Sequence, residues 1–223
     1  MPTSESRNAI EKLLQDRAQF VSWLTRLNSG GGEAPIVPEA VRGLLDSRRI
    51  GFHSERTVER IEPEARELVL ADGERVPFDL LLAIPPHRAP AVVRESPLAG
   101  PNGFVPVDRA TLATTAEGVS ALGDVTAIPI AGGKFLPKAG VFAHGQAEVV
   151  ARRIAAELGG RAPTASFEGK GACFLELGDG KAGYASGDFY AEPGPQVRMR
   201  RPGRRWHLGK VVFERVWLWR WFR

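Results

Sequence analysis

The fold expected of this chain is decided by the stretch Thr114-Thr115-Ala116-Glu117-Gly118-Val119-Ser120-Ala121-Leu122-Gly123-Asp124. Its pattern predicts a hydrophobic strand that ends in Gly123-Asp124. Open α/β sheets place their ligands at the carboxyl ends of such strands. A glycine there lets a ligand approach the backbone closely, and a carboxylate accepts hydrogen bonds from a polyhydroxyl chain. The stretch therefore predicts an α/β fold with a ligand at the tip of this strand.

A second group of candidate residues precedes the next helix, which we expect over residues 141–158. Pro137-Lys138-Ala139-Gly140 leads into it, and Gly159-Gly160 ends it. The first turn of a helix has free N–H groups and the positive end of the helix dipole. Beside Lys138, the turn that starts at Gly140 and Val141 would stabilise negative charge on a ligand.

These residues resemble the second flavin-binding motif of the pyridine nucleotide-disulfide oxidoreductase superfamily. Further segments narrow the resemblance to its sulfide:quinone oxidoreductase and flavocytochrome c sulfide dehydrogenase branch. They are residues 79–87, 103–108, 138–143, Gln146-Ala147, 171–173 and 210–222. The likeness runs from about Ala34 to the C-terminus.

The resemblance implies an FAD-dependent oxidoreductase, with NAD(P) as a second candidate cofactor. It implies that Asp124 holds the ribityl or phosphate part of FAD. The other implied cofactor-binding residues are Thr114, Gly123, Lys138, Gly140 and Val141. Cys173 and Lys138 are the implied catalytic residues. Sulfide-oxidising relatives use a pair of cysteines beside the flavin, and Lys138 beside the helix N-terminus would stabilise the negative charge of the reduced flavin. Cys173 is the only cysteine of this chain, and a buried structural thiol is the alternative for it.

The first FAD-binding element of that superfamily is missing at the start of this chain. Members open with a strand and a G-x-G-x-x-G turn that binds the pyrophosphate. The literal match here, residues 178–183, lies between two strand-like runs, so we expect a hairpin turn there. The chain therefore looks like the C-terminal part of a flavoprotein.

The expected architecture is α/β, with partial FAD/NAD(P)-binding (Rossmann-like) domains and a smaller β-rich C-terminal domain. The expected domains are a helical leader (1–33), a remnant of the NAD-type domain (34–100), the C-terminal half of the FAD-binding domain (101–162) and a C-terminal domain (163–223). Helices are expected at 5–28, 38–46 and 141–158. Strands are expected at 49–53, 67–70, 74–76, 80–84, 118–124, 171–177, 182–189 and 197–199.

The charge of the chain is concentrated at its C-terminus. The net charge is +4, but residues 195–223 hold nine Arg and Lys against Glu214 alone, a net charge of +8. Four of the five tryptophans lie there too. Indole and basic side chains together suit an anionic membrane surface. A helix packed on its own domain is the alternative, and nucleic acid is not expected. The basic residues fall around several sides of a helical wheel, which favours a short wedge over a long surface-lying helix.

Length and composition limit the remaining possibilities. A hydrophobic content of 43% with 25% charged residues is typical of a globular protein, and no apolar run approaches a membrane span. The first residues lack the pattern of a signal peptide, so the cytoplasm is the expected location, with peripheral attachment to the inner face of the membrane. No histidine has a second ligand at metal-binding spacing, so no metal is expected.

The function expected on the resemblance is electron transfer from a small donor, sulfide or NAD(P)H, through FAD to a quinone-like acceptor. Two alternatives stay open. The chain is a non-catalytic remnant or subunit that needs a partner chain to bind FAD, or it is a membrane-surface module that acts through residues 206–223.

Overall fold

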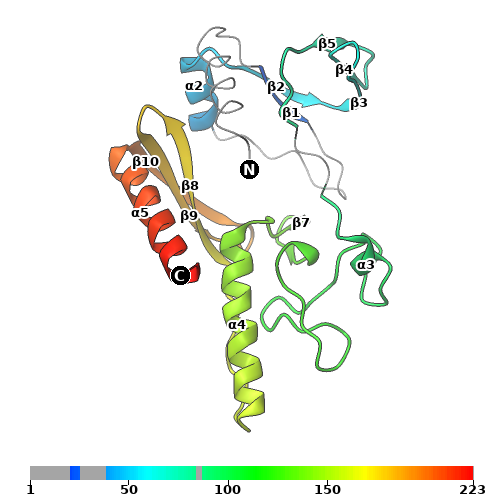
Figure 1. Ribbon diagram of the computed structural model, residues 1–223, viewed down its shortest axis with the longest axis vertical. Coiled ribbons are helices and arrows are strands. Elements are labelled where there is room, and N and C mark those ends of the chain that lie inside the picture. The colour runs from blue at the N-terminus through cyan, green and yellow to red at the C-terminus, as the bar shows by residue number, and fades with distance from the viewer. Residues whose placement is uncertain (1–20, 26–38, 84–86, 223) are drawn as a thin grey trace. The chain divides into compact units, whose positions relative to one another are not determined.

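The computed structural model of this chain describes residues 21–25, 39–83 and 87–222. They fall into two compact units, Met1–Pro86 and His87–Arg223, and each is described by itself. Both units contain helices and strands (Figure 1), as expected of an α/β fold. The division between the two units follows Pro86.

The first unit combines a small parallel pair with an antiparallel sheet. β1 (Val21–Thr25) pairs in parallel with β2 (Gly51–Arg56), and α2 (Glu39–Ser47) lies between them in the chain. β3 (Val58–Glu62), β4 (Glu67–Leu70) and β5 (Arg75–Pro77) form the antiparallel sheet β3-β4-β5. The strands expected at 67–70 and 74–76 are confirmed as β4 and β5, which pair as a hairpin with Gly73 in its turn at a φ of 86°.

Two predictions in this unit are wrong where the structure describes them. Residues 21–25 of the expected helix 5–28 form strand β1, because Val21, Trp23 and Thr25 favour extended backbone and β2 offers a pairing edge. The remainder of that segment lies outside the described residues. Residues 80–83 are not a strand, and the Leu82 side chain is 82% exposed. These residues pair with no strand in the described part of the chain. Their apolar character alone was therefore not enough to form a strand.

The second unit begins with loops and a long helix. Its first elements are α3 (Ala91–Arg94), the single 3-10 turn η1 (Gly123–Val125), β6 (Pro129–Ile130) and β7 (Lys134–Phe135). The helix α4 (Gly140–Leu158) then ends at Gly159, as expected. The strand predicted over residues 118–124 is wrong: Ser120 forms an isolated bridge with Ala113, and the segment ends in η1. Gly118 and Gly123 have φ values of 72° and 71°, which a continuous strand does not allow.

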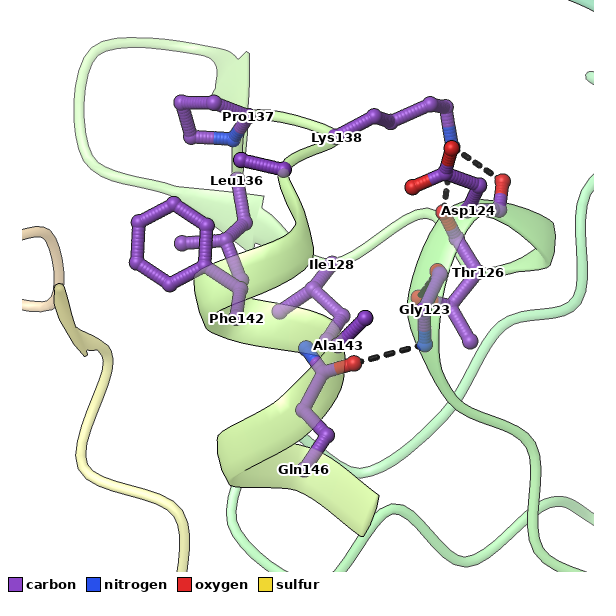
Figure 2. Close-up of a pocket in the computed structure, with 11 residues that line it drawn as sticks. Gly123, Asp124, Thr126, Ile128, Leu136, Pro137, Lys138, Phe142, Ala143 and Gln146 are labelled. Atoms are coloured by element: carbon purple, nitrogen blue, oxygen red, sulfur yellow. Dashed lines mark hydrogen bonds between the residues drawn. The ribbon is translucent and has the colours of Figure 1, made fainter. Parts of the chain in front are cut away.

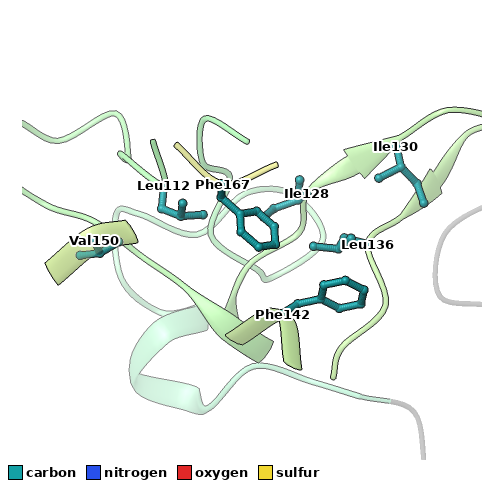
Figure 3. Packing of buried hydrophobic residues seen from close by; sticks show 7 residues of the cluster. All are labelled: Leu112, Ile128, Ile130, Leu136, Phe142, Val150 and Phe167. Atoms are coloured by element: carbon teal, nitrogen blue, oxygen red, sulfur yellow. The ribbon is translucent and has the colours of Figure 1, made fainter. Parts of the chain in front are cut away.

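A cluster of buried apolar side chains joins these loops to α4 (Figure 3). Its members are Leu112, Ile128, Ile130, Leu136, Phe142, Val150 and Phe167. The Phe142 ring makes edge-to-face contacts with Phe167 and Phe189, at centroid distances of 6.5 and 4.9 Å. Apolar burial of this kind is the main force that fixes α4 beside η1.

The C-terminal part is an antiparallel sheet with a helix on it. β8 (Lys170–Gly178), β9 (Lys181–Asp188) and β10 (Gln196–Gly203) form a sheet in the order β10-β9-β8. Asp179 and Gly180 both have positive φ in the β8–β9 turn, so residues 178–183 are the expected hairpin turn. The helix α5 (Arg204–Trp221) follows β10 directly.

Opposite faces of this sheet contact the two long helices of the unit. A side chain at Gly171 of β8 would collide with the Phe142 ring, since its Cβ would lie 2.4 Å from that ring, so the glycine lets α4 approach. Phe174 lies on the other face of β8 and its ring is 6.3 Å from that of Phe213 of α5. The Trp206 ring of α5 stacks on Tyr184 of β9 at 4.7 Å.

Candidate functional site

The candidate site is built on the η1 turn, which carries Asp124. The residue before the turn, Leu122, has extended backbone and no side-chain oxygen with which to cap it. The Gly123 N–H instead donates to Gln146 Oε1 of α4 at 2.7 Å. The Thr126 hydroxyl donates to the Gly123 carbonyl at 2.8 Å and closes the turn. Asp124 is exposed, so its carboxylate is open to a ligand from solvent.

Lys138 fixes the turn from the other side. Its Nζ donates to the carbonyl oxygens of Asp124 and Thr126, at 2.7 and 2.8 Å. The same ammonium lies 3.8 Å from the centre of the Phe104 ring, a cation–π contact. Burial lowers the pKa of Lys138, and the charge of Asp124 opposes that shift. The lysine is thus held by two backbone carbonyls instead of extending freely toward a ligand.

The start of α4 supplies further hydrogen-bond donors beside this turn. Ala139 is the N-cap, and its carbonyl accepts the N–H groups of Phe142 and Ala143 at 3.0 and 3.2 Å. The amides of Gly140 and Val141 have no acceptor within the helix. The positive end of the α4 dipole therefore lies next to Lys138, where it favours an anionic or electron-rich group.

A small pocket lies between the turn and the helix (Figure 2). It is lined by Gly123, Asp124, Thr126, Ile128, Leu136, Pro137, Lys138, Ala139, Phe142, Ala143 and Gln146. The enclosed space measures about 10 Å³, close to what one water molecule needs. A ligand larger than water must therefore lie across the rim of this pocket, where Asp124 is exposed.

The predicted site residues separate into two groups. Gly123, Asp124 and Lys138 line the pocket. Gly140 and Val141 do not line it but begin the helix at its edge. Thr114 lies away from it, and its hydroxyl donates to the Val119 carbonyl at 2.9 Å within its own turn.

Cys173 is placed on strand β8, opposite Ala185 of β9. Its side chain is exposed, so the alternative of a buried structural thiol is wrong. It is not among the residues that line the pocket.

Sequence reasoning gave no role to Gln146, although it belongs to the pocket. This side chain is only 2% exposed, the more buried of the two buried polar residues in the described part of the chain. Phe142, Gln146 and Val150 are spaced by four and are the buried residues of α4. A single amide in an otherwise apolar helix face was the signal that could have identified it.

The C-terminal tail forms an 18-residue helix, so the expected short wedge is wrong. One side of α5 packs on the sheet through Trp206 and Phe213. Its opposite side exposes an apolar stripe at spacings of three and four residues, which we call the outer stripe of α5: Leu208, Val212, Val216, Trp219 and Phe222. Every member of the outer stripe is at least half exposed.

Exposed arginines lie on α5 and on the strand β10 that precedes it. Their positions are Arg198, Arg200 and Arg201 on β10 and Arg204, Arg205 and Arg215 on α5. None of them forms an ion pair within the part of the chain that the structure describes. No helix among the described residues is long and apolar enough to cross a membrane. The tail therefore combines exposed apolar side chains on α5 with exposed cationic side chains on α5 and β10.

None of the known protein-family models matches the chain. Curated proteins similar to it include two sulfide:quinone oxidoreductases. Mitochondrial sulfide:quinone oxidoreductase of Mus musculus is 25% identical over 162 residues, which cover 70% of this chain and 35% of that protein. The enzyme of the same name from Schizosaccharomyces pombe is 34% identical over 118 residues, 52% of this chain and 24% of that protein. The matches thus span about a third or less of the length of these relatives.

Solved structures share the fold. The sulfide:quinone oxidoreductase of Aquifex aeolicus superposes with a TM-score of 0.70 and 24% identity, over 90% of this chain and 49% of that one. Putidaredoxin reductase in its complex with putidaredoxin superposes with a TM-score of 0.52 and 16% identity, over 84% of this chain and 51% of that one. The chain is therefore a distant and partial relative of sulfide:quinone oxidoreductases in sequence, and it shares its fold with flavin-binding oxidoreductases of the pyridine nucleotide-disulfide oxidoreductase superfamily.

Proposed function

We propose that the chain is a flavin-dependent oxidoreductase of the sulfide:quinone oxidoreductase kind, with FAD held across the rim of the pocket between η1 and α4. The observation that carries this proposal is the exposed carboxylate of Asp124 beside the N-terminus of α4. A carboxylate and free helix amides are complementary to a group that has both hydroxyls and an electron-rich ring edge.

The residues present fit such a group at the rim and not inside the pocket. The enclosed space of about 10 Å³ excludes an aromatic ring system. Gly123 has no side chain to obstruct an approach along the backbone, and Asp124 can accept a hydrogen bond from a hydroxyl group. The amides of Gly140 and Val141 would face the ring edge, with Lys138 adding positive charge behind them. When bound, the flavin would take electrons from a donor and release them to an acceptor.

The names of the relatives support a choice of donor and acceptor. Those proteins are named for sulfide and quinone, and we propose a small reductant, sulfide or NAD(P)H, with a quinone-like acceptor. The Cys173 side chain is exposed, so its thiol is accessible to solutes. Anaerobic mixing of the FAD-loaded chain with sulfide or NADH tests this proposal. Bleaching of the flavin by sulfide that a Cys173→Ser variant loses would support a role for the thiol, and equal bleaching in both proteins would contradict it.

Titration with FAD tests the binding step. An Asp124→Ala variant loses a hydrogen bond to a charged group, worth about 1.5–3 kcal/mol. We therefore expect its FAD dissociation constant to rise roughly 10- to 100-fold. Asp46→Ala on α2, where the carboxylate is also exposed, is the matched control and should bind like the wild type. Equal affinity of the Asp124→Ala variant and the wild type would refute the proposed site.

The alternative is a subunit that binds FAD only together with a second polypeptide. It is supported by the coverage of the relatives, since the chain matches 49% of the Aquifex enzyme. A chain that takes up FAD only when a polypeptide with a G-x-G-x-x-G segment is added would favour this alternative. Tight binding by the isolated chain would rule it out.

We also propose that α5 attaches the protein to the inner face of a membrane, as a peripheral contact of a cytoplasmic protein. The outer stripe of α5 would enter the interface while the exposed arginines of α5 and β10 meet acidic headgroups. Flotation with vesicles that contain phosphatidylserine tests this. Val212→Asp should abolish flotation, whereas Val197→Asp on β10 should not, and the two valines are 51% and 49% exposed. Equal flotation of the two variants would contradict attachment through α5.

A further inference from the structure

Gln146 is a buried amide whose position no apolar packing requirement explains. It is 2% exposed and lies on the core-facing side of α4, in line with Phe142 and Val150. Burial of an amide is unfavourable unless the group is hydrogen-bonded. Its Oε1 accepts the Gly123 N–H at 2.7 Å, across 23 residues of sequence. Figure 2 shows the amide oxygen directed at Gly123, with Asp124 following in the turn.

The turn needs this acceptor because its own cap cannot supply one. Leu122 precedes η1 with φ of −149° and ψ of 164°, and no side chain at that position caps the turn. Gly123 itself has a φ of 71°, a conformation that other residues rarely adopt. A Cβ added there would lie 3.3 Å from the Cβ of Ala143, so the glycine also lets the turn approach α4 closely. The Gln146 oxygen therefore acts as a helix cap supplied by a different element.

Lys138 holds the far end of the same turn through the carbonyl oxygens of Asp124 and Thr126. Two side chains thus restrain the turn, one through its first N–H and one through its last carbonyls. The Asp124 carboxylate accepts no hydrogen bond from the residues that the structure describes, and it is exposed. The backbone that carries it is therefore fixed while its oxygens stay available.

We propose that Gln146 is a positioning residue for ligand binding: it orients the Asp124 carboxylate by capping the turn at Gly123. This inference rests on the proposed function, because the ligand concerned is FAD at the rim of the pocket. Loss of the cap frees the turn, and the carboxylate then samples orientations that do not bind. The affinity for FAD falls although no group that contacts FAD has been changed.

The test compares two variants of α4 in the full-length chain. Gln146→Leu keeps the size of the side chain but removes the acceptor. Val150→Ala removes apolar packing one turn further along the same buried face and leaves both the cap and the pocket lining intact. We expect Gln146→Leu to raise the dissociation constant of FAD about tenfold. Val150→Ala should change it by less than about twofold, although it lowers stability.

Hydrogen exchange of the Gly123 amide, followed by NMR without FAD, gives a second readout. Gln146→Leu should accelerate this exchange at least about tenfold. In Val150→Ala the Gly123 amide should exchange more slowly than in Gln146→Leu. An unchanged Gly123 exchange rate, or equal losses of FAD affinity in the two variants, would overturn the inference. No FAD binding by the wild type would overturn the inference and the proposed function together, whereas normal binding by Gln146→Leu would overturn the inference alone.

Discussion

Replacing Lys138 by methionine tests how the turn below Asp124 is held. The substitution keeps the aliphatic stem and removes an ammonium that donates to the Asp124 and Thr126 carbonyls at 2.7 and 2.8 Å. Each hydrogen bond from a charged donor is worth about 1.5–3 kcal/mol, and the contact with Phe104 adds about 0.5–1 kcal/mol. Partial exposure and the desolvation that lowers the pKa of Lys138 reduce the sum. We expect a net loss of about 2 kcal/mol in the free energy of unfolding.

Urea unfolding followed by tryptophan fluorescence is a suitable assay for this loss. Four of the five tryptophans belong to the second unit, so the signal reports mainly on the unit that contains Lys138. Lys134→Met is the matched control, because Lys134 lies exposed on β7 and forms no ion pair with the residues that the structure describes. An equal free energy of unfolding for the two variants would refute a structural role for the Lys138 ammonium.

Two further predictions concern the packing of the second unit. Gly171→Ala places a Cβ 2.4 Å from the Phe142 ring and should lower the free energy of unfolding by about 1–3 kcal/mol. Gly194→Ala is the control, because its Cβ meets nothing within 4 Å and should be tolerated. Equal melting temperatures of the two variants would contradict the contact between Gly171 and Phe142. Burial raises the pKa of Tyr190 to about 12, so the contribution of Tyr190 to stability is full below pH 10 and is lost as the pH rises toward 12. In a Tyr184→Phe variant, where Tyr190 is the only tyrosine, phenolate absorbance should appear near pH 12, and an ordinary titration near pH 10 would show that the side chain is not buried.

Local signals in the sequence predicted those elements that local interactions determine. The α4 helix has its stop signal at Gly159-Gly160, and the β8–β9 hairpin has its turn residues at Asp179 and Gly180, so both were confirmed. Both elements satisfy most of their backbone hydrogen bonds within one short stretch of chain.

Elements that depend on distant partners were not predictable in the same way. An apolar run such as residues 80–83 becomes a strand only beside another strand, and it pairs with none in the described part of the chain. Residues 118–124 were also expected as a strand because of their apolar run. In the structure the positive φ of Gly118 and Gly123 produces a loop and a turn instead.

The candidate site was partly predictable. The motif predicted that Gly123, Asp124 and Lys138 belong to one site, and all three line the same pocket. The cap by Gln146 was not predictable from spacing, because the hydrogen bond joins residues 23 positions apart whose proximity depends on the packing of α4. Lys138 was expected to stabilise charge on a ligand. In the structure its ammonium donates to the backbone of the turn, and this contact depends on where the Thr126 carbonyl lies as well as on the position of Lys138.

The most direct measurement of the central claim is an NMR titration of the ¹⁵N-labelled chain with FAD. The account predicts saturable shifts of the amides of Gly123, Asp124, Gly140 and Val141, which surround the rim of the pocket. Amides that do not shift, or shifts confined to residues away from η1 and the start of α4, would contradict it.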